Sequence, residues 1–135
     1  MREYARVQTA VLLRRLAYEV NHAAKSGDAD SVHDLRVAIR RFSRCLRTFD
    51  QFYPRHVGKR CRRELSELLG AAGEVRDRDI ALEMIAKAGI SARASIVTRL
   101  RAERMKASHD LLAEVRRWSH SDFSRKWRNA LELES

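Results

Sequence analysis

Five chargeable side chains recur at helical spacing within residues 31–50, SVHDLRVAIRRFSRCLRTFD. At 100° per residue they fall within an arc of about 80° that contains no acidic residue. We call this set the arginine row; its members are His33, Arg36, Arg40, Arg44 and Arg47. Like charges one turn apart destabilise a helix, so the row has a reason other than folding. Guanidinium groups donate paired hydrogen bonds to phosphate oxygens, which makes the row a candidate site for a multivalent anion.

Further basic residues surround the row. Residues 36–63 hold ten Lys or Arg and a single acidic residue, for a net charge of +9, whereas the rest of the chain is nearly neutral. Such a concentrated positive patch attracts polyanions. The additional candidates for anion binding are Arg41, which lies off the row, Lys59, Arg60 and Arg63, which we expect to form the opposite wall of a groove, and Arg76, which we expect at the end of that groove.

Two of these candidates have an alternative role. Arg41 is also suited to an ion pair with an acidic residue on another helix, and His33 to a hydrogen bond between helices. Arg62, by contrast, is expected to be solvated. Asp50, three residues after Arg47, is the one acid placed to neutralise part of the row.

No motif in the sequence points to catalysis. The segment HVGKR lacks the upstream glycine and the Ser or Thr of a phosphate-binding loop. The five histidines never pair at i,i+4 and no CxxC occurs, so a metal site has no signature. Asp77 and Asp79 are the only carboxylates suited to acid–base or metal chemistry, and their i,i+2 spacing favours a structural role. We expect a binding protein without catalytic residues, metal or cofactor.

The elements that position these residues are predicted to be helices. A chain of 135 residues with 44% apolar residues, one proline and five glycines is typical of a single all-α domain spanning residues 1–135. We expect helical segments at about 3–25, 31–50, 56–72, 74–88 and 91–118, followed by a short one from about 121. Gly73 and Gly89 are expected to end the third and fourth segments, and Asp30 or Ser31 to cap the second.

Three of the segments carry an apolar face at helical spacing. Their packing predicts an antiparallel bundle of four main helices plus short additional helices. The predicted core residues are Val32, Leu35, Ile39, Phe42, Leu46 and Phe49 in the second segment, Val57, Cys61, Leu65, Leu68 and Ala72 in the third, and Ile96, Leu100, Ala107, Leu111 and Val115 in the fifth.

The cellular setting is predicted from what the sequence contains. No apolar run of about 18 residues is present, so we expect no membrane span. The first 20 residues, MREYARVQTAVLLRRLAYEV, are typical of a helix of the mature protein rather than of a signal peptide. Two cysteines are too few for a disulfide framework. These observations favour the cytoplasm.

Residues 32–47, VHDLRVAIRRFSRCLR, followed by LGAAGEVRDRD at 69–79, resemble the CHAD family, the conserved-histidine α-helical domain. The resemblance rests on the histidine, the Arg-Val pair, the double arginine and the later Arg-Asp-x-Asp. It implies a helical bundle that binds inorganic polyphosphate on a basic surface without catalysis, with polyphosphate granules as a site of association. The family usually carries two such bundles in tandem, whereas this sequence holds one, with a weak echo at 108–118. We therefore expect a homodimer.

Two other functions compete with polyphosphate binding. Phosphate contacts alone give salt-dependent, sequence-independent affinity for DNA or RNA. Against this, we expect no exposed aromatic residue and no Asn or Gln beside the arginines to stack on bases or read them. A scaffold that docks on an acidic protein partner is the third possibility, and competition for labelled polyphosphate separates the three.

Overall fold

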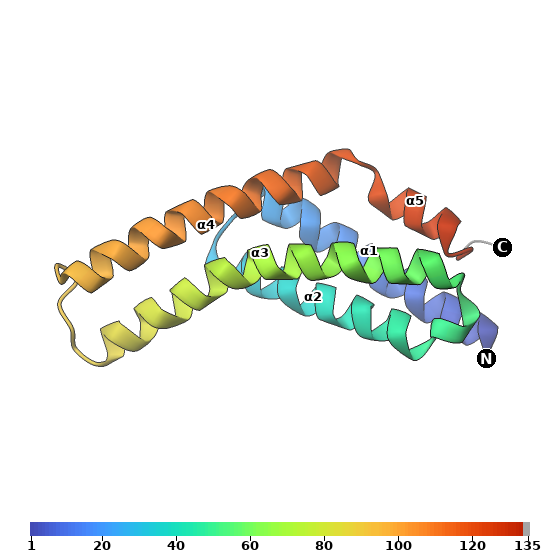
Figure 1. The fold of residues 1–135 in the computed structure, drawn as a ribbon, viewed down its shortest axis with the longest axis horizontal. Coiled ribbons are helices and arrows are strands. Elements are labelled where there is room, and N and C mark those ends of the chain that lie inside the picture. The colour runs from blue at the N-terminus through green and yellow to red at the C-terminus, as the bar shows by residue number, and fades with distance from the viewer. Residues whose placement is uncertain (134–135) are drawn as a thin grey trace.

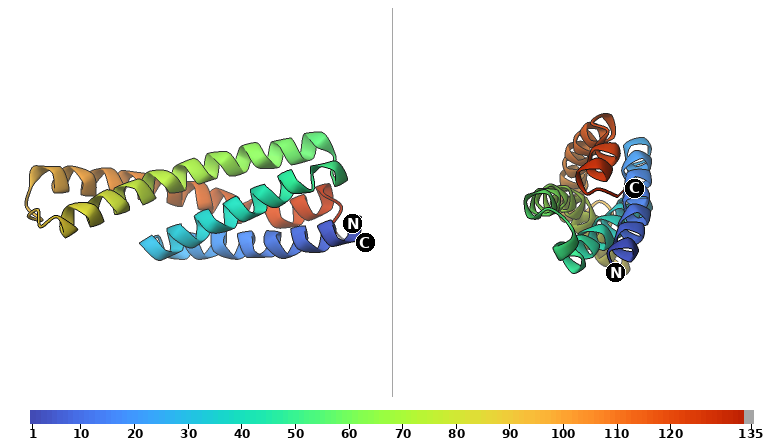
Figure 2. Two further views of the ribbon diagram at one scale, coloured as in Figure 1. Left: turned by 90° about the horizontal axis from the view of Figure 1, so that it is seen from below. Right: turned by 90° about the vertical axis from the view of Figure 1, so that its right-hand side faces the viewer.

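The computed structural model describes residues 1–133 and consists of five α-helices and one short 3-10 helix (Figure 1). The elements are α1 (Arg2–Lys25), α2 (Ala29–Thr48), η1 (Asp50–Phe52), α3 (Arg55–Lys87), α4 (Ser95–His120) and α5 (Phe123–Ala130). Helices α1 to α4 each run antiparallel to the next helix in the chain, α5 continues in the general direction of α4, and α4 also packs against α1 (Figures 1 and 2). The predicted all-α bundle of four main helices with short additional ones is confirmed.

The core forms where the apolar faces of the helices meet. All predicted core residues of α2 and α3 are buried except Phe49, which is half-buried. In α4 the prediction is partly wrong, because Ile96 is 42% exposed and Val97 is buried in its place. Near the chain's end α5 closes the bundle: Trp127 stacks on Phe42 with ring centroids 5.8 Å apart.

The predicted break at Gly73 does not occur. Helix α3 continues through Gly70 and Gly73 for 33 residues, a length of about 50 Å. A glycine inside a helix costs only about 0.5–1 kcal/mol relative to alanine. Burial of Ala72 and Val75 on the face already formed by Leu65 and Leu68 outweighs that cost.

The turns show which residues end the helices. Asp28 caps α2, because its carboxylate accepts a hydrogen bond from the backbone N–H of Ser31 at 2.8 Å. This corrects the expectation that Asp30 or Ser31 is the cap. Gly89 follows α3 with φ of +76°, a left-handed conformation that glycine adopts without steric cost, and it ends the helix as predicted.

The α3–α4 hairpin extends well beyond the α1–α2 hairpin (Figures 1 and 2). Arg104 joins the two hairpins where the shorter one ends: its Nε donates to Asp79 at 2.9 Å and its Nη2 to the carbonyl of Gly27 at 3.2 Å. Beyond this level α3 and α4 have only each other as partners. No helix among residues 1–133 is long and apolar enough to cross a membrane.

Candidate functional site

The arginine row occupies the exposed side of α2. Asp28 starts the helix, and burial of Leu35, Ile39, Phe42 and Leu46 on one side turns the row to the other. His33, Arg40, Arg44 and Arg47 are exposed, and Arg36 is half-buried. The structure therefore brings the row together as a continuous charged surface along α2.

None of the ten candidate residues forms an ion pair or side-chain hydrogen bond within residues 1–133. The same part of the chain contains ten other ion pairs, such as Arg15–Glu19 at 2.9 Å and Lys87–Glu83 at 3.2 Å. Asp50, the acid placed three residues after Arg47, pairs with Arg62 at 3.4 Å rather than with Arg47. No ion pair within the described residues neutralises the row, and the side chains of Arg40, Arg44 and Arg47 are exposed to solvent.

Arg36 differs from the rest of the row because part of its side chain is covered. Its Nε is buried and has no hydrogen-bond partner in the structure. Burial is the main cause that lowers the pKa of Arg36, and the positive charge of Arg40 lowers it further. Arg76 on α3 acts in the same sense and Asp77 acts against it. These effects place Arg36, Arg40 and Arg76 in one crowded positive environment where α2 meets α3.

The candidates on α3 do not all face α2. Lys59 and Arg63 are exposed one turn apart, and Lys59 lies one turn before Arg62, whose contact with Asp50 marks the side toward α2. Arg60 is directed elsewhere: together with Arg117 and Lys126 it borders a cavity between α3, α4 and α5. The structure does not bring Arg60 to the arginine row.

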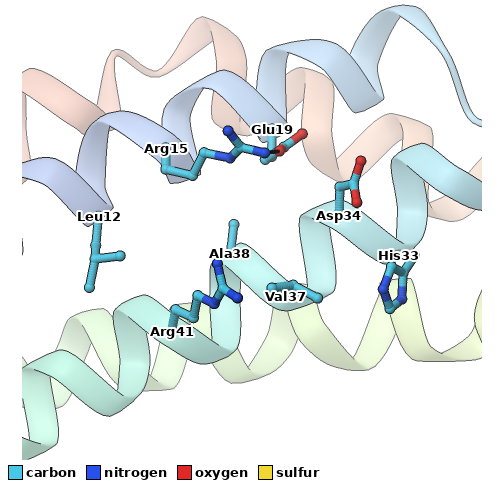
Figure 3. Close-up of a pocket in the computed structure, with 8 residues that line it drawn as sticks. All are labelled: Leu12, Arg15, Glu19, His33, Asp34, Val37, Ala38 and Arg41. Carbon is cyan, nitrogen blue, oxygen red and sulfur yellow. Dashed lines mark ion pairs between the residues drawn. The ribbon is translucent and has the colours of Figure 1, made fainter.

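Arg41 lies on the opposite side of α2 from Arg36, beside α1. It lines a cavity of about 280 Å³ between the two helices (Figure 3). Arg15 and Glu19 reach this cavity from α1, opposite Asp34 and Arg41 of α2, and His33 stands at its edge. The cavity has acidic as well as basic walls, which distinguishes it from the uniformly basic row.

Asp77 and Asp79 differ in their surroundings. Asp79 is largely covered and accepts the hydrogen bonds from Arg104 that join α3 to α4, which is a structural role. Asp77 is exposed and acts on Arg36 electrostatically. No group of three or more His, Cys, Asp or Glu side chains suited to a metal ion is found in the part of the chain that the structure describes.

Two features of the site were not predicted from the sequence. The carboxylate of Glu19 is 3% exposed and paired with Arg15 in the wall of the α1–α2 cavity; its i,i+4 spacing from Arg15 was the available signal. Arg62, expected to be solvated, is held by Asp50 beside the row. That contact joins residues from different elements, and no local spacing indicates it.

Comparison with known families agrees with this geometry. The sequence profile of the CHAD domain matches residues 8–135, nearly the whole chain. No curated protein and no solved structure matches it significantly. The residues that carry the resemblance lie in α2 and α3, on either side of the contact between Arg36 and its neighbours. On the match over residues 8–135, the chain belongs to the CHAD domain family.

Proposed function

We propose that this chain binds inorganic polyphosphate along the arginine row of α2, as a binding or targeting module without catalytic activity. Membership of the CHAD family, which is associated with polyphosphate binding, supports the choice of anion. The observation that carries the proposal is that no residue of the row forms an ion pair or a side-chain hydrogen bond among residues 1–133; Asp77 acts on Arg36 only at longer range. Folding leaves a file of guanidinium groups available to an external anion.

The chemistry of polyphosphate suits this surface. The polymer carries about one negative charge per phosphate at short, regular intervals and offers no bases to be read. A helix repeats its side chains every 5.4 Å along the axis, and each guanidinium group can donate two parallel hydrogen bonds to phosphate oxygens. Successive turns of α2 therefore present one donor group after another along the direction of an extended chain.

Neighbouring cations extend the proposed site toward α3. The positive charge of Arg76 acts on Arg36 across the contact between α2 and α3. Lys59 and Arg63 are exposed near the start of α3. Binding of an anion relieves the repulsion among Arg36, Arg40 and Arg76, so part of the binding free energy comes from this crowding. Arg60 lies outside the proposed site, because it borders the cavity between α3, α4 and α5. Arg41 lies at the edge of the site, beside the α1–α2 cavity.

The test compares two triple variants that remove the same charge. R40A/R44A/R47A removes three exposed residues of the row, and R2A/R14A/R116A removes three exposed arginines elsewhere that form no ion pair among residues 1–133. Charge-assisted hydrogen bonds contribute about 1.5–3 kcal/mol each, so the first triple should lose on the order of a thousandfold in affinity for long-chain polyphosphate. The second should lose far less. Equal losses would mean that only net charge matters.

Competition decides between polyphosphate and the other polyanions. The exposed aromatic residues Tyr4 and Tyr18 lie on α1 rather than on α2, and Tyr4 packs edge-on against Phe49, so α2 itself offers no exposed aromatic ring for stacked bases. We expect unlabelled polyphosphate to displace labelled polyphosphate at phosphate concentrations where duplex DNA and single-stranded RNA do not. Displacement by nucleic acid at equal phosphate concentration would favour a general polyanion-binding protein, and displacement only by an acidic protein would favour a scaffold.

The proposal includes a cellular setting and an assembly. We place the protein in the cytoplasm, in association with polyphosphate granules, and expect it to act as a homodimer. Two copies side by side join two arginine rows into a longer surface for one polymer. Co-localisation of the tagged protein with stained granules, and its loss in the row triple variant, tests the setting.

A further inference from the structure

The far half of the α3–α4 hairpin has an apolar side that no other helix covers. Arg76, whose charge acts on Arg36 of α2, marks the side of α3 that faces α2. Ile80 and Met84 follow Arg76 at four-residue intervals, so they continue the same side beyond the end of α2. Their exposed fractions are 38% and 65%.

Helix α4 also carries an exposed apolar side chain on the side that α1 covers in the other half of the hairpin. Ser119 bonds to Asn21 at 2.7 Å and Ser108 lies against Gly27, which marks the side of α4 that faces α1. Met105, three residues before Ser108, continues this side and is 73% exposed. The side of the hairpin that α1 and α2 cover in one half is therefore uncovered in the other half (Figures 1 and 2). There Ile80, Met84 and Met105 are exposed next to the Glu83–Lys87 ion pair.

The tip of the hairpin is purely basic. Residues 84–102 contain no acidic residue. Of their four cations, Lys87 pairs with Glu83, whereas Arg93, Arg99 and Arg101 form no ion pair among residues 1–133. The turn between α1 and α2 is the opposite: residues 26–35 contain no Lys or Arg, and Asp28, Asp30 and Asp34 are all exposed there. One molecule thus carries two surfaces of opposite charge, separated by the uncovered half of the hairpin.

From this arrangement we infer that two copies of the chain pair through their α3–α4 hairpins, antiparallel, with the basic tip of each on the acidic α1–α2 turn of the other. The pairing is self-complementary, as a two-fold dimer requires, because each copy supplies one tip and one turn. Each hairpin occupies the space beyond the partner's α1–α2 turn and covers the exposed side chains of Ile80, Met84 and Met105. The inference rests on the homodimer proposed above and names its interface; it does not depend on polyphosphate.

A charge-reversal experiment on the polyphosphate-free protein tests this interface. Variant R93E/R101E reverses the tip, and D30K/D34K reverses the turn while it leaves the cap residue Asp28 in place. In either variant alone the contacting surfaces carry like charge, so dimerisation should weaken by about tenfold or more. R116E/K126E reverses two exposed cations outside the interface and should dimerise like the unchanged chain.

The decisive measurement mixes the two reversed variants. In a mixed pair both contacts are again between opposite charges, so sedimentation should show a species of twice the 15.6 kDa chain mass that neither variant forms alone. A mixture that stays monomeric, or an R93E/R101E variant that dimerises normally, overturns the inference. If circular dichroism shows that R93E/R101E is unfolded, R93E alone, in the turn before α4, replaces it.

A different interface would give a different pattern. Helix α1 has its own exposed apolar stripe, Tyr4, Val7, Val11 and Tyr18, with exposed fractions between 45% and 60%. Dissociation by V7E/V11E together with normal dimerisation of the tip variant would place the interface on α1 and overturn the hairpin pairing. Polyphosphate affinity of the same variants is read separately, so failure of the interface and failure of polyphosphate binding are distinguishable.

Discussion

Arg36 is the residue at which stability and binding oppose each other. Its Nε is buried without a partner, and Arg40 and Arg76 add repulsion. A buried donor without a hydrogen bond costs about 1–3 kcal/mol. We therefore expect Arg36 to destabilise the free protein, and a bound anion to add negative charge to the partial compensation that Asp77 provides.

We predict that Arg36→Met raises the free energy of unfolding by about 1 kcal/mol, because it removes the buried donor and keeps an apolar chain of similar length. The same variant should bind polyphosphate more weakly. Chemical denaturation and a binding titration measure the two effects. Arg40→Met, which removes an exposed charge, is the control and should change stability less. A loss of stability in Arg36→Met would show that the guanidinium group is satisfied in the folded protein.

Asp28 makes part of the stability depend on pH. The hydrogen bond from the backbone N–H of Ser31 is the main cause that holds the pKa of Asp28 below its usual 3.8. Because the pKa of Asp28 is lower in the folded state, the stability that its carboxylate adds as the cap of α2 is present above pH 3.8. This stability is lost as the pH falls through the folded-state pKa. Asp28→Ala should therefore be less stable than the unchanged chain at pH 7, with a difference that shrinks below pH 3.8.

Thermal unfolding between pH 2 and pH 7 measures this difference, over the range in which an aspartate titrates. Asp28→Ser is the control, because serine caps a helix without titrating. Its stability relative to Asp28→Ala should not vary with pH. A constant gap between the unchanged chain and Asp28→Ala over the whole range would rule out the carboxylate as the source.

At the scale of the elements, α3 contains two glycines that the helix does not need. A Cβ atom added at Gly70 or Gly73 meets no atom within 4 Å. Gly70→Ala and Gly73→Ala should each stabilise the protein by about 0.5–1 kcal/mol, because alanine loses less backbone entropy in a helix. Urea denaturation of the single and double variants checks this.

Gly89 provides the matched contrast. A Cβ at this position also meets no atom within 4 Å, but the backbone φ of +76° is unfavourable for alanine. Gly89→Ala should therefore destabilise the protein while the two changes within α3 stabilise it. Destabilisation by Gly70→Ala would indicate that α3 bends or opens at that position in solution.

The spacing of residues in the sequence predicted those features of the structure that depend on a single helix. The two sides of α2 follow from its period, so the buried Leu35 and Ile39 and the exposed Arg40 and Arg44 were predictable. The continuity of α3 through its two glycines could not be predicted in this way. Glycine costs a helix little, so packing against the other helices determines whether the helix continues. The direction of the Arg60 side chain could not be predicted either, because it depends on which side of α3 packs against α4 and α5.

At the scale of the whole molecule, the charge distribution predicts a salt effect. If the four arginines of the row neutralise phosphates, the affinity for polyphosphate should fall with salt, with a log–log slope of roughly −3 at about 0.7 per contact. R40A/R44A/R47A should reduce the slope by about 2, because three contacts are removed. Fluorescence titrations at several salt concentrations measure both slopes. An affinity independent of salt would contradict electrostatic binding by the row.

The two cysteines lie on the helices that frame the proposed site, Cys45 on α2 and Cys61 on α3, and both thiols are free and buried. Burial is the main cause that raises the pKa of Cys61 to about 12, and burial also raises the pKa of Cys45. A thiol in this state reacts with an alkylating reagent only when the bundle opens and exposes it. The labelling rate of the unmodified chain therefore reports how often α2 and α3 separate, and a polyanion bound across these helices should slow the labelling of both cysteines.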